Sequence, residues 1–198
     1  MRHALLFAAA CLACATAQPM RESRDPILAP LAVSPSVHVE SEEVIYEVHA
    51  TSPQKAREEM NRRRPVGDRG PFDALTKWFV SWHFSHRKEG GRCRVGTPRI
   101  EVAITTTLPR WIEGESTEGW QRYLAGLSEH ESGHAQNARA AGEAVFETLE
   151  KLPPAASCGD LDAQATREGK EVLRSFNAED DAYDQRTRHG KTQGATFP

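Results

Sequence analysis

The chain has 198 residues, a formal net charge of −3 at pH 7 and a pI of about 6.2. Hydrophobic residues make up 38% and charged residues 27%, which is ordinary for one globular domain. This slightly acidic balance gives no electrostatic reason to bind nucleic acid or an anionic membrane surface, so we expect neither as a partner.

Residues 1–17 predict a secretory signal peptide. The apolar run from Ala4 to Ala13 is too short to span a bilayer, and Ala15-Thr16-Ala17 fits a small-x-small cleavage site. A lipoprotein signal acylated at Cys11 or Cys14 ranks second, because neither cysteine has a leucine three residues before it. We therefore expect cleavage after Ala17, no transmembrane segment, and a secreted or periplasmic mature protein.

Residues 18–41 predict a proline-rich linker in front of a single domain at 42–198. This stretch has no periodic hydrophobic run and contains Pro19, Pro26, Pro30 and Pro35. An inhibitory prosegment is the alternative, but no feature of the sequence supports it specifically.

The first half of the domain predicts a small antiparallel sheet with one early helix. Alternating apolar residues indicate the strands, while Ser52-Pro53 is typical of an N-cap followed by the first helical residue. Lys88-Glu89-Gly90-Gly91 is typical of a hairpin turn. The expected elements are strands at 42–50, 74–87, 92–95 and 99–107, and a helix at 53–63.

Two cysteines remain in the mature chain, Cys93 and Cys158. An even pair in an oxidising compartment predicts a disulfide between them. The bond would close a loop of about 66 residues and stabilise the fold by roughly 4 kcal/mol in the chain-entropy model.

A long helix is predicted from Thr117 to Lys151, and it carries His130-Glu131-Ser132-Gly133-His134. Apolar residues recur at helical spacing on both sides of this motif. Histidines four residues apart project from the same side of a helix, so both imidazoles can reach one metal ion. The glutamate between them can act on a water at that ion. This H-E-x-x-H arrangement predicts a Zn²⁺ site with His130 and His134 as ligands and Glu131 as the catalytic base. Gly133 has no side chain, which is expected to leave one flank of the ion open.

Catalytic zinc usually takes a third protein ligand. The extended motif that places a histidine six residues after the second one fails here, because that residue is Ala140. The last predicted helix, which starts near Asp160, and the tail after it offer Asp184 and His189 instead. We favour His189 as the ligand and Asp184 as its orienting partner, with the reverse assignment as the alternative. Tyr183 is a candidate donor to the developing oxyanion, or else a core residue.

Several segments of the sequence together resemble the pattern of a known family. They are the strand with Trp78 and Trp82, Cys93, Leu108-Pro109-x-Trp111, Trp120, the 130–134 motif with Ala138, Cys158, and the closing Tyr183-Asp184-x-x-Thr187-x-His189-Gly190-x-x-Gln193-Gly194-Ala195. Over about residues 42–198 the chain resembles the domain-of-unknown-function 922 family, bacterial secreted proteins described as predicted zinc-dependent proteases. The resemblance implies a zincin-like site. In zincins the last sheet strand commonly pairs with an extended substrate, which would make Arg99–Thr107 the binding strand.

The expected fold is therefore α+β and zincin-like, with a small antiparallel sheet, a preceding helix, a long metal helix and a C-terminal helix. The predicted function is a secreted zinc metallopeptidase that acts on a peptide or protein substrate. The alternatives are a non-catalytic secreted metal-binding or interaction module, and a zinc amidase acting on cell-wall peptides.

Overall fold

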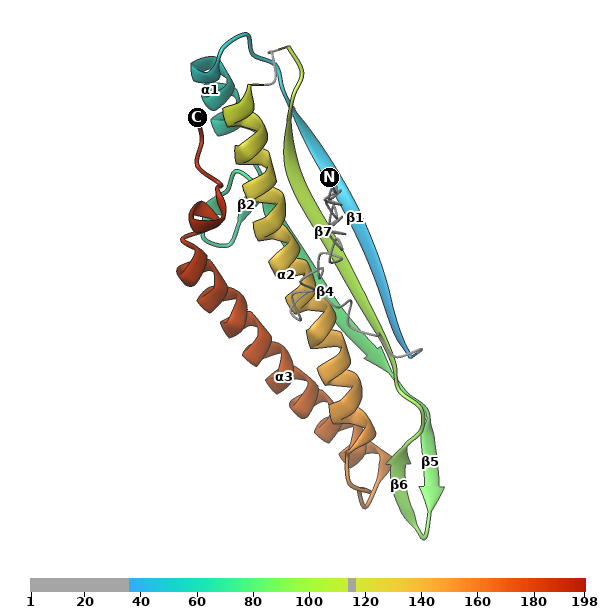
Figure 1. Cartoon of the computed structure of the whole chain (residues 1–198). Coiled ribbons are helices and arrows are strands. Elements are labelled where there is room, and N and C mark those ends of the chain that lie inside the picture. The colour runs from blue at the N-terminus through green and yellow to red at the C-terminus, as the bar shows by residue number, and fades with distance from the viewer. Residues whose placement is uncertain (1–35, 114–116) are drawn as a thin grey trace, which may run out of the picture. The chain divides into compact units, whose positions relative to one another are not determined.

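A computed structural model describes residues 36–113 and 117–198. The predicted signal peptide at 1–17, and residues 18–35 of the predicted linker, lie outside the described residues. The elements are β1 (Val37–Val48), α1 (Pro53–Arg63), β2 (Val66–Gly67), β3 (Gly70–Pro71), β4 (Leu75–His83), β5 (His86–Glu89), β6 (Arg92–Val95), β7 (Arg99–Trp111), α2 (Glu118–Glu150), α3 (Cys158–Thr187) and the 3₁₀ turn η2 (Lys191–Gln193). The fold is α+β, as predicted (Figure 1).

The main sheet is mixed, so the prediction of a purely antiparallel sheet was wrong. Its strand order is β1-β7-β4, with β7 parallel to β1 and antiparallel to β4. The parallel pair joins strands separated by α1, β4 and two hairpins, and this crossover lets the chain return in the same direction. Strand β1 begins at Val37, which is 6% exposed, so residues 37–41 belong to the sheet and not to the linker.

The strand predicted at 74–87 is two strands. β4 ends at His83, and β5 begins at His86 and pairs with β6 in a separate hairpin. Gly90 and Gly91 make the two-residue turn with φ of +59° and +78°, which favours glycine at both positions.

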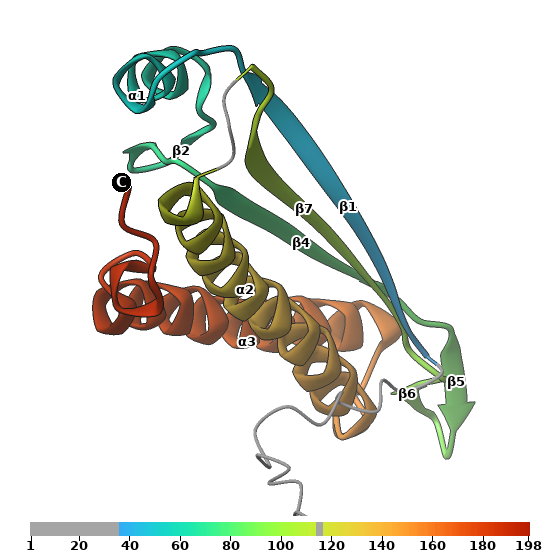
Figure 2. The ribbon, with the colours of Figure 1, turned by 45° about the horizontal axis from the view of Figure 1, so that its top comes forward.

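Helix α2 packs on the sheet, and α3 packs on α2 (Figures 1 and 2). The core between them contains buried side chains from the sheet and both helices: Val37, Val80, Ile100, Val102, Ile104, Ala138, Ala141, Val145, Leu149 and Ala165. Helix α3 also approaches β4 directly, since a Cβ at Gly169 would lie 2.8 Å from the Trp82 indole. Side-chain caps from Thr117 and Ser157 begin the two helices.

A second core holds the start of α2, α1 and the C-terminal tail together. Trp120 and Tyr123 of α2 both pack edge-on against Phe197, at ring-centroid distances of 6.0 and 5.3 Å. The tail backbone passes so close to Gly126 that a Cβ there would collide with Gly194 and Ala195. The tail is therefore part of the folded domain.

The predicted disulfide between Cys93 and Cys158 is present, with a Cα–Cα distance of 5.1 Å. It joins β6 to the first residue of α3, beside paired backbone hydrogen bonds between Cys93 and Ala155, both of 2.9 Å. Among the described residues, no helix is long and apolar enough to cross a membrane.

Candidate metal centre

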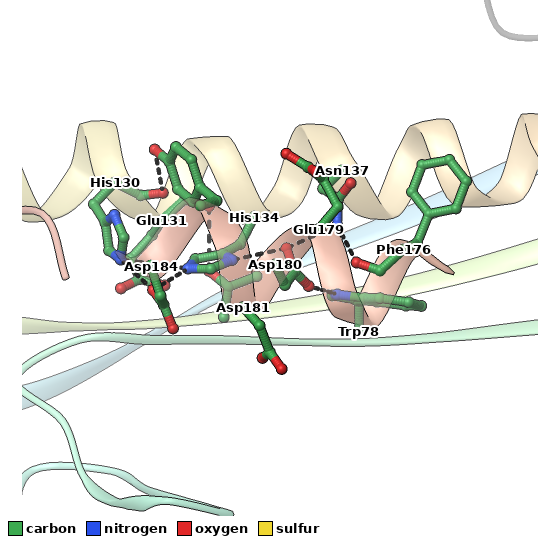
Figure 3. A network of polar contacts seen from close by, with 12 residues as sticks. Trp78, His130, Glu131, His134, Asn137, Phe176, Glu179, Asp180, Asp181 and Asp184 are labelled. Carbon is green, nitrogen blue, oxygen red and sulfur yellow. Dashed lines mark hydrogen bonds and ion pairs between the residues drawn. The ribbon is translucent and has the colours of Figure 1, made fainter. Parts of the chain in front are cut away.

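Three ligand atoms from α2 and α3 converge on one point. The Nε2 atoms of His130 and His134 are 3.3 Å apart, and Asp184 Oδ1 lies 3.1 Å from the first and 3.2 Å from the second. His130 is 5% exposed, and the side chains of His134 and Asp184 are 12% and 18% exposed. The i, i+4 spacing on α2 aligns the two imidazoles, and the packing of α3 on α2 brings in the carboxylate (Figure 3).

Each imidazole is oriented through its other ring nitrogen. His134 Nδ1 lies 2.9 Å from Asp180 Oδ1, and His130 Nδ1 lies 3.1 Å from Gln193 Oε1. Both partners accept hydrogen bonds, so both rings carry a proton on Nδ1 and direct Nε2 toward the shared point. Metal-binding histidines are typically oriented in this way.

Asp180 is a site residue that the sequence analysis missed. Its Oδ1 also accepts from Asn137 Nδ2 at 2.8 Å, and its Oδ2 accepts from Trp78 Nε1 at 2.7 Å. These bonds tie β4, α2 and α3 around one carboxylate. The available signal was its position four residues before Asp184, one turn along the same face of the helix.

The donor set fits a tetrahedral zinc ion. Three ligands at about 2.0–2.1 Å from one Zn²⁺ lie roughly 3.3 Å from each other. The three pairs here are 3.1, 3.2 and 3.3 Å apart. Two imidazoles and one carboxylate are common zinc ligands, and three protein ligands leave a fourth position for water or substrate.

Without a metal, this cluster needs protons to hold it together. Burial lowers the pKa of His134, but hydrogen bonds to Asp180 and Asp184 outweigh burial and raise that pKa to about 10. For Asp184, burial raises the pKa, but hydrogen bonds from His130 and His134 outweigh it and hold the pKa well below its usual range. A divalent cation would take the place of these bridging protons.

His189 does not join this cluster. Its Nδ1 lies 3.5 Å from Asp184 Oδ1, its side chain is 55% exposed, and it lies outside the group of atoms that could hold one ion. The preference for His189 as the third ligand is therefore not supported by the geometry, which favours the alternative, Asp184. The reason is local: α3 continues to Thr187, so Asp184 still points from the helix toward α2, and His189 follows in a left-handed turn at φ +52°.

Tyr183 packs against both imidazoles and does not face the open side of the site. Its ring stacks on His130 at 5.0 Å and meets His134 edge-on at 5.1 Å, and its hydroxyl donates to the His130 carbonyl at 3.2 Å. It fills the space beside Gly133, where a Cβ would collide with the hydroxyl. The role expected for Gly133 was wrong: the glycine admits Tyr183 and does not leave a flank open. This arrangement gives no support to Tyr183 as an oxyanion donor.

Glu131 is 4% exposed, and its Oε2 is buried with no hydrogen-bond partner among the described residues. Burial raises its pKa, although Thr76 and the two histidines act in the opposite direction. A carboxylate oxygen left without a donor in this position is suited to accept a proton from a bound water or substrate.

The metal centre opens into a cleft of about 910 Å³. The residues that line the cleft come from the β2–β3 hairpin, the start of β4, α2, α3 and the tail; they include Asp68, Arg69, Phe72, Thr76, Lys77, Glu131, Asp181 and Lys191. The three metal-binding candidates and Glu131 all line it.

One family model matches residues 44–190, and its description is bacterial protein of unknown function (DUF922). The matched stretch contains the whole His130–His134 motif and Asp184. No curated protein and no solved structure matches the chain.

Proposed function

The chain belongs to this DUF922 family, and on that premise we propose that it is a zinc-dependent metallopeptidase. In this proposal zinc is held by His130, His134 and Asp184, and Glu131 is the general base. The family description assigns no activity, so the proposal depends on the chemistry of the site.

The observation that carries the proposal is the convergence of three ligand atoms beside a buried glutamate whose Oε2 has no hydrogen-bond partner among the described residues. The two Nε2 atoms and Asp184 Oδ1 lie 3.1 to 3.3 Å from one another, as one tetrahedral ion requires. Glu131 is next to the first ligand in sequence and lines the same cleft. A purely structural histidine pair would not need a buried carboxylate with an unpartnered oxygen beside it.

Zinc bound here would supply a Lewis acid that polarises the scissile carbonyl and lowers the pKa of water toward about 7. Glu131 takes a proton from the attacking water and passes it to the leaving amine. Asp180 and Gln193 keep the His134 and His130 imidazoles in the ligating tautomer. Tyr183 holds the His130 backbone and covers the rear of both rings.

The strand expected to bind substrate, Arg99–Thr107, cannot do so. It belongs to β7, the central strand, whose two edges pair with β1 and β4. β4 is an edge strand of this sheet, and Leu75 and Thr76 at its start line the cleft, as does Ala74 just before it. We therefore assign substrate pairing to β4, where an extended peptide would add a strand beside Glu131.

The test is Glu131→Gln in the mature protein. Zinc content should stay near one ion per chain, while hydrolysis of an unstructured protein such as casein should fall by about 100-fold or more, because the general base is lost. Arg139→Gln is a control on the same helix, since Arg139 contacts Ser41 and not the metal cluster. Cleavage at the wild-type rate by the Glu131 variant would refute the mechanism. Bound zinc with no turnover on casein or on cell-wall peptides would leave a metal-binding module.

A further inference from the structure

In the cleft that contains the metal centre, an arginine of the β2–β3 hairpin is paired with α3. Arg69 lies in the turn between β2 and β3, and its Nη2 donates to Asp181 Oδ1. Asp181 is three residues before Asp184 on α3, and both Arg69 and Asp181 line the cleft. In Figure 3 the carboxylates of Asp180 and Asp184 point toward the imidazoles, whereas Asp181 points away from them.

We propose that Arg69 binds a carboxylate of the peptide substrate. When no substrate is bound, the Asp181 side chain takes the place of that carboxylate and pairs with Arg69. This inference rests on the proposed function and deepens it: it names a peptide carrying a carboxylate near the cleaved bond as the substrate class. The carboxylate can come from an acidic side chain or from the peptide's C-terminus.

The pair can be exchanged at low cost. The side chains of Arg69 and Asp181 are 55% and 47% exposed, and an ion pair this accessible to water contributes little to stability. A guanidinium has five N–H donors, and the pair with Asp181 engages Nη2. Arg69 can thus offer a two-pronged hydrogen bond to an incoming carboxylate, the geometry that arginine provides best.

Outside the Arg69–Asp181 pair, the unpaired charges that line the cleft are balanced, and a bound zinc ion would make the cleft favour an anion. Three of its other aspartates are engaged: Asp73 by Arg57 and Arg64, Asp180 by His134, and Asp184 by the metal-binding histidines. Among the described residues, the lining charges with no ion pair are Lys77, Lys191, Asp68 and the general base Glu131. A bound zinc ion would add positive charge, so a cationic substrate group would find few free acidic partners.

The experiment measures peptide binding to zinc-loaded Glu131→Gln protein by calorimetry, so that it does not depend on turnover. Four peptides of one sequence carry either Glu or Gln beside the central bond and either a free or an amidated C-terminus. We expect one of the two carboxylates to tighten binding by about 5- to 10-fold. A difference in affinity between the Glu and Gln peptides would show that the side chain is recognised, and a difference between the free and amidated peptides would show that the C-terminus is recognised.

Adding Arg69→Ala to this background should abolish the preference, and adding Asp181→Asn should increase it, because the competing carboxylate is gone. Arg186→Ala is the matched control: Arg186 pairs with Glu179 at 2.7 Å on α3, with similar exposure, outside the cleft. It should leave the preference unchanged.

Three results would overturn the inference: an unchanged carboxylate preference in Arg69→Ala, an equal change in affinity for all four peptides in both cleft variants, or no binding of any peptide. An equal change in affinity for all four peptides would mean that the Arg69–Asp181 pair only holds the β2–β3 hairpin against α3. If the Glu131→Gln protein binds peptides in a carboxylate-dependent way but the wild-type protein does not hydrolyse them, the proposed peptidase is overturned and carboxylate binding by Arg69 stands. Hydrolysis by the wild-type protein without a carboxylate preference in binding would overturn this inference and leave the proposed peptidase standing.

Discussion

Asp184 and His189 come from the same end of α3, but they differ in what they contact. Asp184 Oδ1 touches both imidazole Nε2 atoms, whereas His189 lies beside Asp184 on the exposed side. Asp184→Ala should therefore leave the site largely empty at micromolar zinc. His189→Ala should weaken zinc by no more than about 10-fold, as expected for a residue that supports a ligand. Zinc titration with a competing chelator measures both, and the opposite ranking would restore His189 as the ligand.

Asp180 controls the His134 tautomer by accepting from its Nδ1. In Asp180→Asn the amide has no charge and can present its NH₂ group to the imidazole, so Nε2 would no longer be fixed as the ligand. We expect zinc affinity to fall about 10- to 100-fold while the chain stays folded. Glu179→Gln, the neighbouring exposed position, is the control. If the two variants bind zinc equally well, Asp180 serves only to connect Trp78 and Asn137.

At the scale of elements, α2 and α3 approach each other closely at Gly133. A Cβ at this position would collide with the Tyr183 hydroxyl and ring. In an open helix interior, Gly→Ala adds about 0.5–1 kcal/mol of stability. Gly133→Ala should instead destabilise the fold by about 1–3 kcal/mol, because Tyr183 and α3 must shift.

This shift would also move Asp184, so Gly133→Ala should weaken zinc binding. Gly159→Ala is a suitable control, since the nearest atom to a Cβ there is Ser157 Oγ at 3.8 Å. Urea unfolding and zinc titration would test the pair of variants. Equal stability in the two would show that Tyr183 adapts without moving the helix.

How much the sequence could predict depended on whether the signal was local. The start and N-cap of α1 follow from Ser52-Pro53, and the alignment of the paired histidines follows from their helical spacing. The partners Asp180 and Gln193 could not be assigned, because they reach the imidazoles only through the packing of α3 and the tail. The direction of β1 was likewise missed, since its pairing with β7 is set by a crossover and not by neighbouring residues.

At the scale of the whole domain, a half-buried carboxylate joins four segments at the end opposite the disulfide. Asp73 accepts from Arg57 Nη1 at 2.7 and 2.8 Å, from Arg64 at 3.2 Å and from the Tyr123 hydroxyl at 2.5 Å. Its backbone carbonyl accepts from the Tyr46 hydroxyl at 2.7 Å. These bonds hold α1, β1 and the start of α2 to the loop that leads into the cleft.

This cluster should make the stability of the domain depend on pH. Burial raises the pKa of Asp73, but hydrogen bonds from Tyr123 and Arg57 outweigh burial and lower it below its usual range. The stabilisation is then complete above the unfolded-state pKa of about 4, and it is lost as the pH falls through the lower folded-state pKa. Asp73→Asn should cost about 2–3 kcal/mol at pH 7.

The difference between wild type and Asp73→Asn should shrink steadily below about pH 4, because the wild-type carboxylate then takes up a proton and loses its advantage. Urea unfolding of both proteins from pH 7 to pH 3 measures this difference. A chelator should be present throughout, so that protonation of the metal-binding histidines affects both proteins alike and cancels. Two parallel curves, with a constant gap across the acid range, would mean that Asp73 contributes by shape and hydrogen bonding and that its charge adds nothing.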